Sequence, residues 1–400
     1  MTTHVYGDGI NSTSGENTIR HFYDRAGIKA ANRVNVFQQF ADRRSMPQKY
    51  GKTFKTSKWL HMYDRAKDHP DFATRGYLTA RSMDEVSASL NGARLPEGAG
   101  AMNERTLHKI TVETSLSRYG EMINYTDEVD LFSEDHIQIK YREELGELAN
   151  SRNEDLVMVD MLATPTVLLA GPAASVGQIG ANVAADGSDD DEYRVSYDLI
   201  RKATRLLLRN RAKKNTSIID GDVKVDTRTV ARAYYAIIGA DVKADLENLT
   251  RGTGYEREYV FIPVHKYASA GKLANGEVGA MHEVRFIEAE GMGVYRGEGA
   301  VPPVGYLGDL SVSNVVDADS VDEADRGNFD AFPILFPTQG AFATVGLKGM
   351  GKIKFRAKSP DADSLSNPYG TKGFFSYNMW YAGLILEEEK LLKVLVAASA

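Results

Sequence analysis

The chain has 400 residues, of which 42% are hydrophobic and none is cysteine. This length exceeds what one hydrophobic core usually organises, so we expect two packed regions. The absence of cysteine excludes disulfides and thiol chemistry, as is typical of a chain folded in a reducing compartment. A basic-then-apolar leader and a membrane-length apolar run are both absent, so we expect a soluble protein, made inside a cell, without a membrane partner.

Charge is distributed unevenly along the chain. Residues 1–82 contain 14 Lys or Arg and 7 Asp or Glu, a balance of +7, so the remaining residues must carry −14 to give the net charge of −7. A basic segment can contact an acidic protein surface or nucleic-acid phosphates. Cations between Lys49 and Lys58 alternate with Tyr50, Phe54 and Trp59, a composition also found on nucleic-acid surfaces. Because basic stretches are more often solvated or paired, we expect them to contact protein.

The first elements predicted are an N-terminal arm at residues 1–75 and an extended β-hairpin loop at residues 76–132. Residues 78–100 are rich in small polar side chains, too many to bury a core. The following segment alternates strictly, with Ile110, Val112, Thr114 and Leu116 on one face of a strand. A two-stranded ribbon of this kind is marginal alone in water, so it must lie on its own chain or on a neighbouring copy.

A long helix is predicted at residues 133–165. Ser133 is placed to be its N-cap, negative charge follows in the first turn, and Pro165 ends it. The helix would be about 45 Å long at 1.5 Å per residue. Apolar residues recur at three- and four-residue steps: Ile137, Tyr141, Leu145, Leu148, Leu156 and Val159. The other face is charged and is expected to meet solvent or another subunit: Lys140, Arg142, Glu143, Glu147, Arg152 and Glu154.

The rest of the chain predicts a mixed α+β body. A helix is expected near residues 197–213, with Ser196 as its cap. Residues 379–386 are apolar on both faces, which indicates a central strand, and residues 391–396 should return beside it or follow the long helix. Residues 291–327, with an acidic run, are expected to form an insertion or a surface excursion. Other strands are predicted at 166–170, 233–238, 283–289, 331–336, 341–346 and 352–357.

The nearest approach to a catalytic motif runs from Gly346 to Lys352. Its spacing is that of a phosphate-binding loop, but Ile353 stands where the magnesium-binding Ser or Thr belongs. Ile353 and Phe355 then alternate with cations as in a strand, whereas a phosphate loop must open a helix. The eight histidines show no zinc pattern, and the acidic segments 186–192 and 317–325 lack the calcium-loop pattern and are expected to be solvated. No catalytic residue, cofactor or metal site is therefore expected.

The order of these segments resembles a known family. A basic N-terminal arm, a loop returning through ITVETSLSRYGEMINYTDEVDL, a long helix and the C-terminal GTKGFFSYNMWYAGLILEEEKLLKVLVAAS are similar to the major capsid proteins of tailed phages with the Hong Kong 97 fold. Within that family the chain looks most like the Enquatrovirus-type podophage coat proteins. Residues 233–249 and 276–288 fit the same pattern, and the resemblance covers roughly residues 75–290 and 330–400.

The resemblance implies a virion structural protein and no enzyme. Hexamers and pentamers would form an icosahedral head around double-stranded DNA, after assembly in the host cytoplasm. The axial domain would be residues 166–344, with an insertion at 291–327, and the peripheral domain would be the long helix plus residues 345–400. A portal and a decoration or scaffolding protein are expected partners, with DNA touched only non-specifically. Contacts between copies are expected at Arg81, Asn91, Arg94, Lys109, Glu113, Arg118 and Arg142.

Two alternatives stay open at this point. One is a tail or tube protein, which would stack into cylinders instead of closing a shell. The other is a nucleotide-dependent assembly enzyme that uses the Gly346–Lys352 loop.

Overall fold

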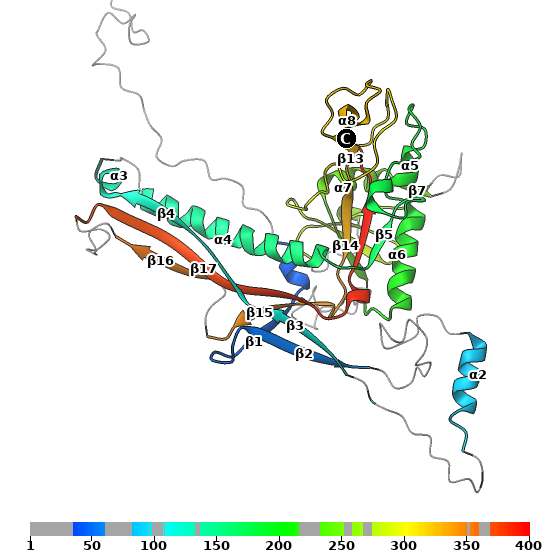
Figure 1. The fold of residues 1–400 in the computed structure, drawn as a ribbon, viewed down its shortest axis with the longest axis horizontal. Helices are drawn as coiled ribbons and strands as arrows, with labels where there is room; N and C mark the ends of the chain where they lie inside the picture. Colours follow the sequence, from blue (N-terminus) through cyan, green and yellow to red (C-terminus); the bar gives the residue numbers. More distant parts are fainter. Residues whose placement is uncertain are drawn as a thin grey trace, which may run out of the picture.

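Two β-sheets and one long helix organise the chain in the computed structural model (Figure 1). The structure describes residues 35–60, 82–95, 97, 107, 109–132, 137–215, 233–251, 258–266, 274–349, 353–359 and 369–400. Helix α4 lies along a five-stranded sheet, and its C-terminal end meets a seven-stranded sheet (Figure 1).

The five-stranded sheet is centred on β17 (Lys372–Ile385). β17 pairs with β4 (Ser117–Thr126) and β16 (Ile353–Lys358) along much of its length, and with β15 (Phe342–Leu347) at its C-terminal end. The outermost strand is β1 (Asp42–Met46), which pairs in parallel with β15. The strand predicted at residues 379–386 is confirmed as the end of β17, where Met379 pairs with both β4 and β16 and residues 382–385 pair with β15.

Helix α4 (Ile137–Leu162) confirms the long helix; its predicted cap, Ser133, lies outside the described residues. Much of the predicted apolar stripe is correct: Leu145 packs in a cluster with Tyr125, Phe375 and Tyr377, and Leu156 packs against a second cluster further along the helix. Val159 was placed on the buried stripe and is 60% exposed. Glu154 was placed on the charged face and is buried, where its carboxylate accepts a hydrogen bond from the Phe37 backbone N–H.

The error in the stripe has a physical cause. The first half of α4 covers one sheet, whereas its second half lies among η3 (Phe37–Phe40), β14 and β17. The buried side of the helix therefore changes along its length, and a single stripe cannot describe it.

The seven-stranded sheet is buried on both faces. On β6, Tyr234, Ala236 and Ile238 pack against α6 (Tyr197–Arg209) and α7 (Ala240–Glu247), while Tyr235 and Ile237 face η3 and α4. Ser196 caps α6 as predicted, because its Oγ accepts from Leu199 N at 3.2 Å. The strand order is β5 (Val167–Leu169), β18 (Leu392–Val396), β14 (Phe332–Phe336), β6 (Tyr234–Ile238), β11 (Val284–Glu288), β10 (Glu277–Met281) and β9 (Ile262–Pro263).

The C-terminal segment corrects the predicted division of the chain. β18 pairs with β5 and β14 in the seven-stranded sheet, and it neither returns beside β17 nor follows α4. Moreover, β15 crosses the predicted boundary between residues 344 and 345 while lying wholly in the five-stranded sheet. The two sheets are thus joined by chain crossings that a division by residue number does not capture.

The extended loop also differs from its prediction. β3 (Lys109–Ser115) has the predicted alternation, but its partner is β2 (Thr53–Trp59), from the segment assigned to the N-terminal arm. We call β2 and β3 the ribbon. Within residues 78–100 the structure contains a helix, α2 (Met83–Asn91), which Ser82 and Glu85 cap reciprocally. Residues 35–46 are part of the body, since η3 and β1 pack and pair within it; residues 1–34 lie outside the described residues.

Residues 171–195 and 291–331 together form a unit that we call the lobe. Its Ile179, Tyr193 and Phe329 share an apolar cluster with Leu395 of β18, so residues 291–327 are more than a surface excursion. Gly180 has a φ of +84°, and a side chain there would overlap the Phe329 ring, so glycine is required. The remaining elements are α3 (Asp127–Phe132), η4 (Val176–Gln178), α5 (Asp190–Tyr193), β7 (Thr250–Arg251), β8 (Glu258–Tyr259), η6 (Val264–Lys266), β12 (Val312–Ser313), α8 (Glu323–Arg326), β13 (Asn328–Phe329) and η7 (Glu388–Lys390).

Candidate functional site

The ribbon is covered by its own chain on one part only. Phe54 packs against a small cluster that includes Leu116 and Val345, and Arg44 Nη1 donates to Thr56 Oγ1 at 3.0 Å. At the far end, Trp59 is 59% exposed. The sequence predicted that the ribbon lies either on its own chain or on a neighbouring copy. One end of the ribbon lies on the sheet of its own chain, and the other end presents apolar surface to solvent.

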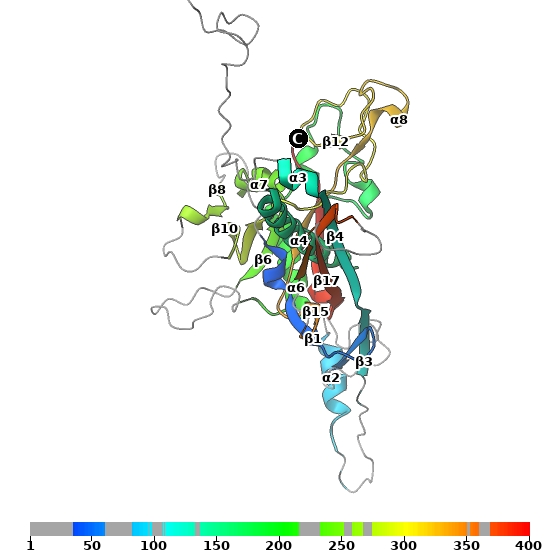
Figure 2. The same cartoon turned by 90° about the vertical axis from the view of Figure 1, so that its left-hand side faces the viewer.

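Helix α2 extends this open surface. It lies beyond the ribbon, away from both sheets (Figures 1 and 2). None of its residues is buried, and Met83 and Leu90 are among the exposed large apolar side chains. A helix without a buried face gains nothing from packing, and exposed apolar groups of this kind mark an interaction surface.

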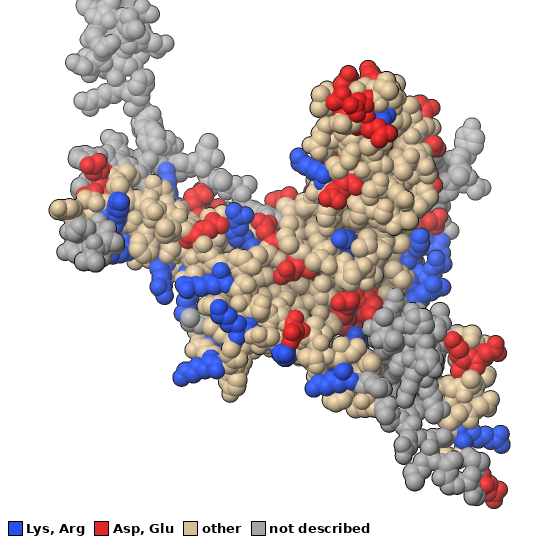
Figure 3. Space-filling model, in the orientation of Figure 1, with Lys and Arg blue, Asp and Glu red and all other residues tan. Residues whose placement is uncertain are grey.

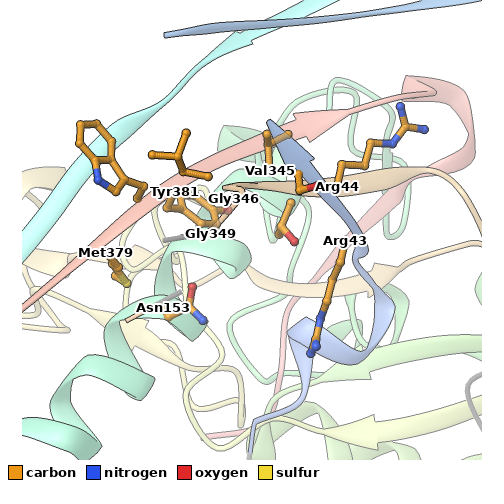
Figure 4. Close-up of a pocket in the computed structure, with 12 residues that line it drawn as sticks. Arg43, Arg44, Asn153, Val345, Gly346, Gly349, Met379 and Tyr381 are labelled. Atoms are coloured by element: carbon orange, nitrogen blue, oxygen red, sulfur yellow. The ribbon is translucent and has the colours of Figure 1, made fainter. Parts of the chain in front are cut away.

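A hollow of about 400 Å³ lies where α4 crosses the five-stranded sheet (Figure 4). Its lining comes from four elements: Arg43 of β1, Asn153 of α4, Thr344 and Gly346 of β15, and Tyr381 of β17. The lining contains no histidine, cysteine or carboxylate, so it offers neither an acid–base pair nor a metal site.

Beside the hollow, Tyr381 and Asp160 connect the sheet to the helix. The Tyr381 hydroxyl donates to Asp160 Oδ2 at 2.9 Å. Burial raises the pKa of Asp160 above its ordinary value, although the hydrogen bonds from Tyr381 and the Gly383 backbone oppose this shift. Burial, together with the neighbouring carboxylate, also raises the pKa of Tyr381. The hydrogen bond thus ties the central strand of the sheet to the helix.

The phosphate-loop motif falls between two strands. β15 precedes it and β16 follows it, and residues 350–352, including Lys352, lie outside the described residues. The strand at Ile353–Lys358 confirms the predicted context, which is wrong for binding phosphate at a helix N-terminus.

In the described part of the chain, no group of three or more His, Cys, Asp or Glu side chains is arranged to hold a metal ion. None of the helices in those ranges combines the length and the apolar character needed to cross a membrane.

The exposed apolar side chains of the ribbon end and α2 are typical of a protein that assembles with other copies, and comparison with known proteins supports this interpretation. The major capsid protein of Pseudomonas phage KPP21 is 28% identical over 396 residues, which cover 95% of this chain and 93% of that protein. Along nearly its whole length, the chain is thus similar to a phage major capsid protein. No family model matches it.

Solved capsid structures with a similar fold identify the fold of this chain. The capsid of Ralstonia phage GP4 matches with a TM-score of 0.56 at 10% identity, covering 98% of this chain and 99% of that one. The cyanophage Pam1 capsid matches with a TM-score of 0.52 at 10% identity, covering 96% and 98%. The capsid of Helicobacter pylori bacteriophage KHP30 matches with a TM-score of 0.51 at 11% identity, covering 99% and 100%. The capsid protein therefore has the Hong Kong 97 fold; the narrower likeness to Enquatrovirus-type podophages stays a prediction.

The described residues among those predicted at contacts between copies lie on or beside α2, on β3, on β4 and on α4. Asn91 ends α2, and Arg94 follows it; both are exposed. On the ribbon, the Lys109 ammonium lies 5.5 Å from the Trp59 ring centre, and Glu113 pairs with Lys55 at 2.6 Å. Arg81 lies outside the described residues.

The other two predicted contacts lie on the five-stranded sheet and on α4. The guanidinium of Arg118 is 5.9 Å from the Trp380 ring centre, and that of Arg142 is 5.6 Å from the Phe375 ring centre. Arg118, Arg142 and Lys109 each have an aromatic neighbour in their own chain. Glu113 has an ion-pair partner in its own chain instead. Contacts between copies at these residues stay a prediction.

Sequence reasoning missed a basic face on α6. Exposed Lys and Arg side chains line one face of α6 and continue beyond its last residue, Arg209. They are Arg201, Lys202, Arg205, Arg209, Arg211 and Lys213. The signal was present in the sequence as a cationic face opposite Ile200, Ala203 and Leu207. Figure 3 shows Lys and Arg beside this helix, whereas acidic residues gather at the tip of the lobe.

The lobe is held by two buried carboxylates, and one of them corrects the expectation of a solvated loop at 186–192. Asp190 is buried, and its Oδ2 accepts from the Tyr306 hydroxyl at 2.8 Å and from Asp309 N at 2.9 Å. Asp330 accepts from Gly297 N at 2.7 Å and also from two serine hydroxyls. In the acidic segment 317–325, Asp317, Asp319, Asp322 and Glu323 are exposed as predicted. Asp325 is half-buried instead, and its Oδ2 accepts from Ser320 Oγ at 3.1 Å.

Proposed function

We propose that this capsid protein closes the icosahedral head of a tailed phage, as hexamers and pentamers around double-stranded DNA. The observation that carries the proposal is the open surface of the ribbon end and α2. These elements project from the body, and no residue of α2 is buried. Trp59, Met83 and Leu90 are exposed. A surface of this kind becomes stable when a neighbouring copy covers it.

Closed rings impose a second requirement. Each copy must present two different, complementary faces, because head-to-tail contacts close only when one face of a copy fits another face of the next. The projecting ribbon and α2 supply one face, and the broad five-stranded sheet with α4 supplies another. The unit around the seven-stranded sheet, with the lobe, would surround the ring axes.

Partners and location follow from this role. The protein acts without catalysis, resides in the virion and assembles in the host cytoplasm. It meets a portal and a decoration or scaffolding protein in the finished head.

Contact with packaged DNA is non-specific and is served by the basic face of α6. Lys202, Arg205 and Arg209 have no carboxylate partner within the described ranges and are free to face phosphates. The pair Arg205→Gln and Arg209→Gln should weaken retention on DNA at low salt, whereas Lys52→Gln and Arg356→Gln should not. Equal retention by both double variants would refute this assignment.

The experiment that tests the main proposal is direct. The expressed and purified chain is examined by electron microscopy and analytical ultracentrifugation across a range of dilutions. Closed shells, or rings of six and five that convert to shells, are the expected result. A monomer that persists at every concentration would contradict the proposal, and open cylinders would favour a tail or tube protein.

A further inference from the structure

The outer loops of the lobe carry a group of exposed apolar side chains. Leu307 is 83% exposed, Val316 is 79% exposed and Val321 is 88% exposed. We call residues 304–307 and 315–325 the lobe tip. Large apolar side chains that gather on a surface in this way mark a site of interaction with another molecule.

The lobe tip is held together by its own backbone. Gly305 N donates to Ala318 O at 3.2 Å, and Val316 N donates to Asp325 O at 2.7 Å. These hydrogen bonds join the two segments of the tip. The apolar side chains are therefore presented on a formed surface and not on separate loops.

The charge of the lobe tip restricts what can cover it. The tip contains five Asp or Glu and no Lys or Arg. Arg326, which follows it, is only 8% exposed and adds little positive charge to the surface. An occupant of this surface must therefore offer apolar contact together with cations, because like charges brought together at an interface are strongly unfavourable.

Helix α6 offers both on a second surface of the same chain. Leu208 is 53% exposed, and Arg201 lies two turns before it on the same side of the helix. Residues 197–213 contain six Lys or Arg and one acidic residue, Asp198. The ion pair between Arg201 and Asp198 is long, at 3.9 Å, and exposed, so it contributes little and leaves the guanidinium available.

The two surfaces lie at different places on the molecule. Figure 3 shows the acidic groups at the tip of the lobe apart from the cations beside α6. A lobe tip can therefore reach an α6 only on another copy. Lys202 and Arg209 lie about a quarter turn around the helix from Arg201 and Leu208, so they stay available for the non-specific contact with DNA.

We propose that the lobe tip of one copy docks on the side of α6 that carries Arg201 and Leu208 in the next copy of the same ring. Leu208 would pack among the exposed Leu307, Val316 and Val321, and the carboxylates of the tip would surround it with partners for the cations. Each copy carries both surfaces, so the contact is head-to-tail and repeats around a closed ring. The proposal rests on the proposed function, since the second copy is a neighbour in the shell.

Cross-linking between two single-thiol variants tests the contact. The chain has no cysteine, so Leu208→Cys and Leu307→Cys each introduce one thiol. Shells assembled from a mixture of the two variants are treated with a short bis-maleimide and separated on a denaturing gel. We expect covalent dimers from the mixture, because the two thiols meet across the contact, and none from shells of either variant alone.

The matched control replaces one side of the contact. Val159 is a 60% exposed apolar residue on α4, so a mixture of Val159→Cys and Leu307→Cys should give no dimers. A mixture of Leu208→Cys and Leu307→Cys that also gives none in intact shells would overturn the docking proposal. Dimers that form from Leu307→Cys alone would overturn it as well, because they would place two lobe tips against each other.

Charge reversal gives a second readout. Arg201→Glu and Asp319→Lys should each lower shell yield by about tenfold or more, because each places like charges at the contact. Together they should restore the yield, since the pair is then complementary again. All four positions that are changed in these experiments, other than Val159, are exposed and lie on α6 or the lobe tip, so the melting of the unassembled protein should be unchanged. Single variants with normal yields, or a double variant that is not restored, would overturn the proposal.

The outcomes separate this proposal from the proposed function. Shells from the unmodified chain without the cross-link would overturn the docking of the lobe tip and leave the proposed function intact. Absence of shells from the unmodified chain would contradict the proposed function itself. A Leu307→Cys thiol that becomes protected only when a second phage protein is added would assign the tip to that protein and overturn docking between copies.

Discussion

Tyr381 of β17 donates its hydroxyl hydrogen to Asp160 of α4 at 2.9 Å, so the central strand of the five-stranded sheet is tied to the second half of the long helix. Two residues further along β17, Gly383 has no side chain, and a Cβ at that position would overlap the Asp160 carboxylate. The helix can approach the strand only because glycine stands there. This contact fixes where α4 leaves one sheet and reaches the other.

The ionisation of Asp160 makes this tie dependent on pH. Because burial raises its pKa, the folded chain binds the proton more readily than the unfolded chain does. Protonation of Asp160 should therefore increase the free energy of unfolding as pH falls through the raised pKa. Below the ordinary pKa of about 3.8, this increase should level off. Above the raised pKa this contribution is absent.

Asp160→Asn should remove this dependence. The amide oxygen can still accept from Tyr381, and no charge is buried, so we expect a melting temperature at pH 7 equal to or a few degrees above that of the parent chain. The advantage should shrink as pH is lowered towards 4. Thermal unfolding of unassembled protein measures it, with Asp198→Asn, whose side chain is 91% exposed, as the control. A variant that melts much lower at pH 7 would show that the charge itself is needed.

The corrected face of α4 gives a second prediction. Leu145 is 1% exposed and packs among aromatic residues, so Leu145→Ala should lower the free energy of unfolding by about 2–5 kcal/mol. Val159→Ala should change it by less than about 0.5 kcal/mol, since Val159 faces solvent. Urea denaturation of both variants decides between the two descriptions of the helix. Equal losses would restore the stripe expected from the sequence.

Features that depend on residues close together in the sequence could be predicted, whereas features that depend on distant residues could not. The cap and buried face of α6 and the alternation of β3 are local, and both are confirmed. The partner of β3 was missed because β2 lies some fifty residues earlier, and no local pattern encodes that register. Helix α2 could have been found, since Ser82 and Glu85 form a visible capping box.

The hollow could not have been predicted. Its residues come from β1, α4, β15 and β17, which meet only in the folded chain. Asn153 reads in the sequence as one more polar residue of a charged helix. Its burial between the helix and the sheet is seen only in the folded chain.

Helix α2 supplies a third prediction. Replacing residues 82–103 by a short Gly-Ser linker should leave the body folded, because no residue of α2 is buried. Shell formation should be lost, since the exposed apolar side chains of the loop no longer reach a neighbour. Melting curves and electron micrographs of the same preparation measure the two outcomes. Normal particles from the shortened chain would refute a role for this loop in assembly.

The lobe gives the last prediction, which concerns Asp330. This buried carboxylate accepts hydrogen bonds from Gly297 N and from the Ser311 and Ser313 hydroxyls, the latter two at 2.8 Å. Asp330→Ala leaves these donors unsatisfied and should lower the free energy of unfolding by about 3 kcal/mol. Asp319→Ala at the exposed tip is the control and should change it by less than about 0.5 kcal/mol. If both variants denature at the same urea concentration as the parent chain, the lobe is held by its apolar cluster alone.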